Sequence, residues 1–246
     1  MKKSVKKRTG REGLGEILNS RSPFIYTEAY KALRTNVEFL SSSNNAKKIL
    51  ITSTLAGEGK SCVSINLAIS LAQTGKKVII LDCDLRKPKL HRYLRIKHAS
   101  QYGVSTVLGG TAELDSAIGY LEDLNLYVML AGPTPPNPTE LLSNQRCKAM
   151  FDRLAERFDY IICDTAPATM VTDAVELSQN CDGVVFVFRQ NYATFDQVGA
   201  AISRLETVNA KILGTVLNMY KAADDSKNYY GYYSSYYSSK SFENED

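Results

Sequence analysis

Hydrophobic and polar positions follow two different periodicities along the chain, and these predict where helices and strands lie. Residues 22–41 carry apolar and aromatic side chains at three- and four-residue steps, the spacing of one face of an amphipathic helix. Residues 48–53 and 77–84 are almost uninterrupted apolar runs, as expected for strands that are covered on both faces. Further strands are predicted at 126–131, 160–164, 183–188 and 212–217, and further helices at 60–73, 139–157, 173–179 and 194–208.

The order of these elements predicts the architecture. Strands separated by helices form right-handed crossovers, which make neighbouring strands parallel and place helices on both faces of the sheet. We therefore predict an α/β fold, a three-layer sandwich around a mostly parallel central sheet. The pattern between residues 87 and 123 is less regular and predicts short helices. Residues 221–246 have no apolar periodicity, so we expect a disordered tail.

Length and composition fit one folded domain with polar ends. The chain has 246 residues, of which 44% are hydrophobic, enough for one substantial core. No apolar run reaches the roughly 18 residues of a membrane span, and no secretory signal is present, so we expect a cytoplasmic protein. Its five cysteines lack metal-ligand or disulfide spacing and are expected to be core residues.

Basic residues are concentrated in residues 1–21, before the first periodic segment. We expect this segment to be a flexible arm. Its lysines and arginines either attract an anionic membrane surface or partner, or are simply solvated.

A glycine-rich turn follows the strand predicted at 48–53. Such a turn, leading into a helix, points backbone N–H groups at phosphate oxygens, and Lys60 and Ser61 would reach the β/γ-phosphates and Mg²⁺. The strict phosphate-loop pattern begins with Gly where this chain has Thr54, but the GxGKS core is intact. We therefore predict a P-loop NTPase-like sandwich that uses ATP and Mg²⁺. The turn consists of Gly57, Glu58, Gly59, Lys60 and Ser61.

Carboxylates stand at the ends of two other predicted strands. Asp82 and Asp84 end one strand, and Asp164 ends another. In an open parallel sheet ligands collect at the carboxyl ends of strands, so the three groups should meet at the phosphate site. One would help to hold the metal, and another would accept the proton of an attacking hydroxyl. Each aspartate taken alone is equally well explained as a helix cap or turn residue.

The C-terminal residues are rich in tyrosine, whose hydroxyl can accept a phosphoryl group. A flexible linker from Tyr220 to Tyr237 has an r.m.s. reach of roughly 20–25 Å, enough to enter a neighbouring active site. A phosphate-handling site with tethered acceptors favours phosphoryl transfer over simple hydrolysis. The candidate acceptors are Tyr229, Tyr230, Tyr232, Tyr233, Tyr236 and Tyr237.

Three segments and the tyrosine-rich end together resemble the bacterial tyrosine kinases, specifically the separate catalytic subunit of capsular and exopolysaccharide systems. The segments are ITSTLAGEGKS, IILDCDLRKP and YIICDTAP, which correspond to the Walker A, A′ and B elements of that family. The resemblance covers the chain from about Tyr26 onward and implies a kinase domain at 22–220. It implies catalytic roles for Lys60, Asp82 and Asp84, and metal binding by Ser61, Asp82, Asp84 and Asp164. It implies nucleotide binding by Gly57, Glu58, Gly59, Lys60, Ser61, Cys62 and Asn218.

The same resemblance implies partners. The family's ExxRxxR assembly motif is matched by Glu28, Lys31 and Arg34 in the predicted helix 22–41, with Lys in place of the middle Arg. This implies a ring-shaped homo-oligomer and a membrane-spanning activator that recruits the chain to the inner face of the plasma membrane. It also implies protein-tyrosine substrates and a cognate phosphotyrosine phosphatase. We expect no nucleic-acid partner.

Two alternatives remain open at this point. One is a positioning or partitioning ATPase of the related deviant P-loop class, in which nucleotide switches dimerisation. Those proteins carry KGGxGK, and the position of the extra lysine is Leu55 here. The other is a nucleotide-sensing scaffold without turnover that regulates a polysaccharide exporter.

Overall fold

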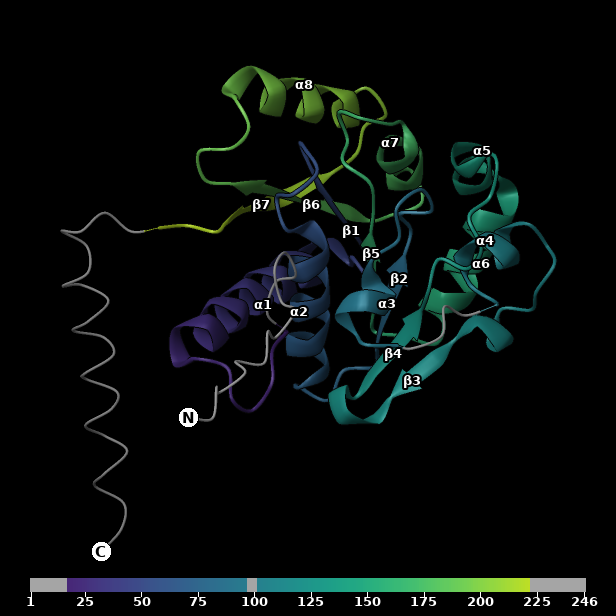
Figure 1. Cartoon of the computed structure of the whole chain (residues 1–246), viewed down its shortest axis with the longest axis horizontal. Helices are drawn as coiled ribbons and strands as arrows, with labels where there is room; N and C mark the ends of the chain where they lie inside the picture. Colours follow the sequence, from purple (N-terminus) through teal and green to yellow (C-terminus); the bar gives the residue numbers. More distant parts are fainter. Residues whose placement is uncertain (1–16, 97–100, 222–246) are drawn as a thin grey trace, which may run out of the picture.

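A seven-stranded sheet forms the centre of the computed structural model, which describes residues 17–96 and 101–221 (Figure 1). The strand order is β3-β4-β2-β5-β1-β6-β7, and neighbouring strands are parallel except for the antiparallel pair β3–β4. This confirms the predicted three-layer, mostly parallel architecture. The strands are β1 Lys48–Ser53, β2 Val78–Asp82, β3 Gly119–Leu121, β4 Leu126–Met129, β5 Tyr160–Asp164, β6 Gly183–Arg189 and β7 Ile212–Asn218.

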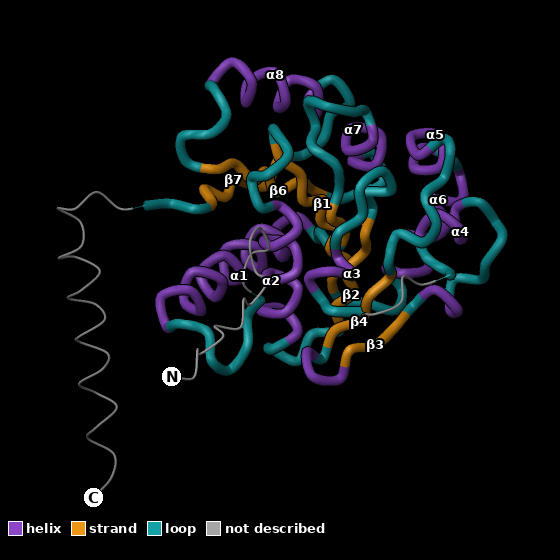
Figure 2. Tube along the Cα trace, in the orientation of Figure 1, coloured by secondary structure: helices purple, strands orange, loops and turns teal. Residues whose placement is uncertain are grey.

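Helices cover both faces of the sheet, as Figure 2 shows. Residues of α1, α2 and α3 share one hydrophobic core with one face, and residues of α4 to α8 share a second core with the other. The helices are α1 Phe24–Asn44, α2 Lys60–Ala72, α3 Leu90–Tyr93, α4 Val104–Leu108, α5 Pro138–Ser143, α6 Gln145–Ala155, α7 Asp173–Ser178 and α8 Phe195–Glu206; η1 Asp115–Ala117 and η2 Glu122–Leu124 are short 3₁₀ turns.

Alternate residues of the central strands belong to different cores. In β1, Leu50 packs with the α4–α8 side, while Ile49 and Ile51 pack with the α1–α3 side. All three side chains have no exposed surface. Successive side chains of a strand point to opposite faces, so a strand covered on both sides has no polar alternation. This is the physical reason for the uninterrupted apolar runs in the sequence.

Two details of the prediction were wrong. The single helix expected at 139–157 is two helices, because Asn144 has an extended backbone and its side chain accepts the N–H of Cys147, which starts α6. The region 87–123, expected to contain only short helices, also contains β3, which pairs with β4 through the turn at η2. A three-residue strand is too short to show a periodicity of its own.

Residues just before α1 are packed against the domain. The backbone N–H of Leu18 donates to Asn66 Oδ1 at 2.8 Å, and the Leu18 side chain is buried. Leu18 lies inside the range 1–21 that the sequence analysis assigned to a flexible arm; the rest of that arm up to residue 16 is outside the described residues. None of the helices within residues 17–96 and 101–221 is long and apolar enough to cross a bilayer.

Candidate active site

The phosphate loop connects β1 to α2 at the carboxyl end of the sheet. Gly57 and Gly59 have φ of 94° and 87°, the left-handed region that favours glycine. A Cβ at Gly59 would lie 2.1 Å from Nδ2 of Asn218, which itself donates to the carbonyl of Glu58 at 2.7 Å. The loop therefore fits against the end of β7 only because Gly59 has no side chain.

Two side chains hold the loop from outside the cavity. Glu58 is buried and its carboxylate accepts the N–H of Leu55 at 2.6 Å and that of Arg189 at 3.4 Å. Tyr192 donates its hydroxyl to the carbonyl of Ala56 at 3.0 Å, and the Arg189 guanidinium lies 4.9 Å from its ring centroid. Glu58, predicted as a nucleotide ligand, thus turns its side chain into the protein and supports the loop.

The three predicted carboxylates and Lys60 come together below this loop. Asp82 and Asp164 are direct partners in the register of β2 and β5, and both are almost fully buried. Lys60, the first residue of α2, places Nζ 3.5 Å from Oδ2 of Asp84. Asp82 Oδ2 accepts the backbone N–H groups of Lys89 and Leu90, which anchors the start of α3 at this site.

Burial and mutual repulsion perturb these groups. Burial, followed by the charge of Asp164, raises the pKa of Asp82 to about 8. Burial also raises the pKa of Asp164, although the charge of Lys60 and a hydrogen bond from Ser61 oppose the shift. Burial on its own would lower the pKa of Lys60, but the nearby carboxylates, Asp164 foremost, raise it. The group is thus a coupled acid–base cluster, of the kind that active sites concentrate.

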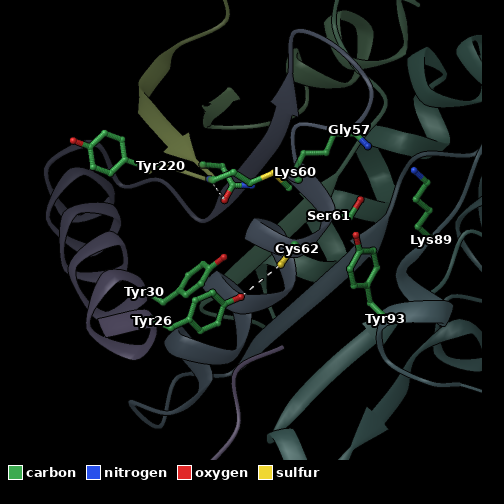
Figure 3. A pocket seen from close by; sticks show the side chains of 12 residues that line it. Tyr26, Tyr30, Gly57, Lys60, Ser61, Cys62, Lys89, Tyr93 and Tyr220 are labelled. Carbon is green, nitrogen blue, oxygen red and sulfur yellow. Dashed lines mark hydrogen bonds between the residues drawn. The ribbon is translucent and has the colours of Figure 1, made fainter. Parts of the chain in front are cut away.

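A cavity of about 390 Å³ opens above this cluster (Figure 3). It brings the phosphate loop together with three walls: tyrosines of α1, the residues around α3, and the end of β7. Of the predicted nucleotide ligands only Glu58 is not part of its lining. The lining residues are Tyr26, Tyr30, Gly57, Gly59, Lys60, Ser61, Cys62, Lys89, Tyr93, Asn218, Met219 and Tyr220.

Comparison with known proteins shows to which protein family this chain belongs. Residues 44–244 match the ParA family, described as NUBPL iron-transfer P-loop NTPase. Tyrosine-protein kinase YwqD of Bacillus subtilis is 37% identical over 207 residues, which cover 84% of this chain and 86% of YwqD. The chain belongs to the bacterial tyrosine kinases. The tyrosine-kinase assignment made from the sequence is thereby confirmed.

Solved structures agree with the assignment of this chain to the tyrosine kinases. The chimerical protein CapA2B2 superposes with a TM-score of 0.75 at 34% identity, covering 82% of this chain and 87% of that chain. The kinase domain of Escherichia coli tyrosine kinase ETK superposes with a TM-score of 0.74 at 30% identity, covering 80% and 78% respectively. The fold of this chain is therefore that of a kinase domain.

The kinase offers oxygens that fit a magnesium ion. Asp82 Oδ1 and Asp164 Oδ2 are buried without a hydrogen-bond partner among the described residues. Those residues contain no cluster of three or more His, Cys, Asp or Glu side chains that could hold a metal by themselves. Mg²⁺ usually keeps several waters and binds through one or two carboxylates plus substrate phosphates, so this incomplete protein shell suits it.

The three residues of the predicted assembly motif do not all point the same way in this kinase. Glu28 and Lys31 form an exposed ion pair of 2.7 Å on α1. Arg34 instead turns toward α2, where Nη1 donates to the carbonyl of Ser70 at 3.1 Å. Only Glu28 and Lys31 are therefore presented outward. The predicted acceptors Tyr229, Tyr230, Tyr232, Tyr233, Tyr236 and Tyr237 lie outside the described residues.

Several site residues carry little signal in the sequence. Tyr26 and Tyr30 read as the apolar face of a helix, yet they line the cavity. Lys89 and Tyr93 lie in the irregular region after the second strand, where no pattern marked them. What the sequence does offer for Lys89 and Tyr93 is their position shortly after Asp84. Residues that follow a strand end at this edge of the sheet lie close to the site.

Proposed function

We propose that this tyrosine kinase uses ATP and Mg²⁺ to phosphorylate its own C-terminal tyrosines between subunits, and that this regulates capsular or extracellular polysaccharide synthesis and export. The observation that supports it most is the meeting of Lys60 with Asp82, Asp84 and Asp164 under an open cavity. A cradle for phosphates and a set of carboxylates are what phosphoryl transfer to a hydroxyl requires.

Each residue has a proposed role. The loop N–H groups and Lys60 bind the β- and γ-phosphates, while Ser61 and one or more of the carboxylates hold Mg²⁺ directly or through its waters. Bound Mg²⁺ would neutralise phosphate charge and orient the terminal phosphate. The carboxylates Asp82, Asp84 and Asp164 are the candidate bases for the phenolic proton. Asn218 at the end of β7 contacts the adenine.

In the proposed homo-oligomer, the C-terminal tail of one subunit lies near the active site of the next subunit. The chain leaves β7 at the cavity, where Met219 and Tyr220 are among the lining residues. We propose a ring-shaped homo-oligomer in which the exposed pair Glu28–Lys31 contacts the next subunit and Arg34 holds α1 in place. A membrane-spanning activator would recruit the ring to the inner face of the plasma membrane, and a phosphotyrosine phosphatase would reset it.

Incubation with γ-labelled ATP and Mg²⁺ tests the proposal. Label in the tail supports the kinase; free phosphate alone indicates the positioning ATPase, and neither indicates a scaffold. Lys60→Met should abolish labelling while the protein keeps its thermal unfolding transition. The position equivalent to the extra lysine of the positioning ATPases is Leu55, which favours the kinase.

Transfer between subunits is tested by mixing two variants. One carries Lys60→Met with an intact tail, and the other has an intact site with its six tail tyrosines changed to Phe. Neither labels its own tail, so label on the Lys60→Met chain shows transfer from the other subunit. Absence of label in the mixture, with normal label in the unmodified protein, would refute transfer between subunits.

A further inference from the structure

Lys89 lines the cavity on the wall opposite α1. Among the described residues, the cavity lining contains two cations, Lys60 and Lys89, and no carboxylate. Lys60 is buried and paired with Asp84. Lys89 is half-buried, and no carboxylate of the described residues lies within salt-bridge distance of its ammonium. A lysine that faces a phosphate cavity without an acidic partner has its charge available for a ligand.

The backbone of Lys89 is fixed by the carboxylate cluster. Its N–H donates to Asp82 Oδ2 at 3.2 Å, and its carbonyl accepts the N–H of Tyr93 at 3.3 Å, so Lys89 starts α3. Residues four apart on a helix lie on one face, which is why Lys89 and Tyr93 line the same wall. Figure 3 shows this wall beside Ser61, with Tyr26 and Tyr30 on the other side of the cavity.

The two ends of the cavity are chemically different. Figure 3 shows Tyr220, which follows Asn218 and Met219 in the chain, at one end of the cavity, and this end suits the base of a nucleotide. The phosphate loop occupies the middle. Lys89 and Tyr93 lie at the other end in Figure 3, and the backbone N–H of Lys89 donates to Asp82 Oδ2. A nucleotide laid along the cavity therefore points its terminal phosphate toward Lys89, which is also where an acceptor hydroxyl in line with the breaking bond must enter.

We propose that Lys89 is a catalytic residue whose ammonium contacts the transferring phosphoryl group. This rests on the proposed kinase function. In the step, the bond between the γ-phosphorus and the β,γ-bridging oxygen breaks, and a bond forms from that phosphorus to the phenolic oxygen. The phenolic proton passes to a site carboxylate, and ADP leaves with the electron pair of the broken bond. The negative charge on the phosphoryl oxygens in flight is what a fixed cation on this wall stabilises.

Three variants test this assignment. Lys89→Met removes the charge, Lys89→Arg restores a cation, and Lys87→Met is the matched control. The Lys87 side chain is exposed and lies outside the cavity lining, two residues away in the chain. The readouts are tail labelling at saturating ATP, binding of MgADP, and binding of MgADP with aluminium fluoride as a planar phosphoryl mimic. Thermal unfolding confirms that each variant is folded.

We expect Lys89→Met to label the tail about 10²- to 10³-fold more slowly at saturating ATP, as removal of one transition-state donor does. MgADP should bind as in the unmodified protein, whereas the aluminium fluoride complex should lose its extra affinity. Lys89→Arg should recover part of the labelling rate and part of the affinity for the aluminium fluoride complex. Lys87→Met should match the unmodified protein in both measurements. Wild-type labelling by Lys89→Met, or a loss explained wholly by weaker MgADP binding, would overturn the assignment.

These outcomes are separate from failure of the kinase proposal. If the unmodified protein does not label its tail, the proposed tail phosphorylation is wrong, and the aluminium fluoride readout still reports whether Lys89 contacts a planar phosphate mimic. If the unmodified protein labels its tail and Lys89→Met does so equally well, tail phosphorylation stands and the role of Lys89 is wrong.

Discussion

Asp82 at the end of β2 and Asp164 at the end of β5 are direct cross-strand partners, and both carboxylates are almost fully buried. Each has one oxygen that lacks a hydrogen-bond partner among the described residues. Two buried acids side by side repel each other when both are ionised, so the pair resists full ionisation until a cation enters. The geometry thus links metal binding, proton uptake and stability.

This link predicts a pH dependence for the metal-free, nucleotide-free protein. The pKa of Asp82 rises from 3.8 in the unfolded chain to about 8 in the folded one. The folded state then keeps a proton that the unfolded state releases, so its free energy of unfolding should fall between about pH 4 and pH 8, by on the order of 1 kcal/mol per unit. Below about pH 4 the stabilisation that the protonated Asp82 gives the folded state is fully present.

The measurement is urea unfolding in EDTA at several pH values, with Asp82→Asn and the exposed Asp196→Asn as the comparison pair. Asp82→Asn should flatten the decline, whereas Asp196→Asn should leave it unchanged. Parallel curves for all three proteins would show that Asp82 does not carry the proton.

Gly59→Ala should damage the phosphate loop for two reasons. A side chain at a φ of 87° costs about 1–2 kcal/mol, and its Cβ would meet Asn218 Nδ2 at 2.1 Å. Displacing Asn218 also breaks its bond to the Glu58 carbonyl. We expect a further loss of about 1–3 kcal/mol of unfolding free energy from this overpacking, with nucleotide binding weakened at least tenfold.

Gly75→Ala is the control for backbone strain. Gly75 has a similar φ of 82°, but a Cβ added there would meet nothing within 4 Å. Denaturant unfolding of the two variants separates the strain from the clash. Equal destabilisation by Gly59→Ala and Gly75→Ala would mean that the Asn218 side chain moves away from the added Cβ without a cost in stability.

Arg86 and Asp173 should couple strongly in stability. Arg86 Nε and Nη2 donate to the two oxygens of Asp173 at 2.7 and 3.0 Å, and Asp173 is fully buried at the start of α7. Arg86→Met leaves that carboxylate with the Thr139 hydroxyl but without its cation. Removal of one partner of a buried pair costs about 3–5 kcal/mol, and half-exposure of Arg86 places this site at the lower end.

The cycle of Arg86→Met, Asp173→Asn and the double variant gives the coupling. We expect about 1–3 kcal/mol from urea unfolding, with the double variant more stable than the sum of the single losses implies. If the free-energy losses of the two single variants add up to that of the double variant, Arg86 and Asp173 do not stabilise each other.

Phosphorylation of the tail should loosen the assembly. Six phosphotyrosines add about −9 to −12 charge at neutral pH, which reverses the net charge of +4 and makes neighbouring tails repel. Sedimentation of fully phosphorylated and unphosphorylated protein at low salt should show smaller species for the former. Raised salt should narrow the difference, because screening weakens repulsion. Identical oligomers in both states would rule the effect out.

The amino-acid pattern was sufficient to predict the layers and the chemistry at the strand ends. Uninterrupted apolar strands alternating with helices specify a sheet covered on both faces, and GxGKS after β1 specifies a phosphate loop because its backbone must adopt left-handed turns. Asp82, Asp84 and Asp164 were found by position alone, since parallel strands end at one edge. These features depend on local pattern and on topology.

The choice of side chains that complete the site depends on tertiary packing. Glu58 turned inward to hold the loop, Arg34 turned to α2, and Lys89 and Tyr93 reached the cavity from α3. None of these directions follows from residue type, because each is set by contacts between segments far apart in the chain. The physical reason is that a side chain's partner is chosen by three-dimensional packing, whereas periodicity records only which face of its own element it occupies.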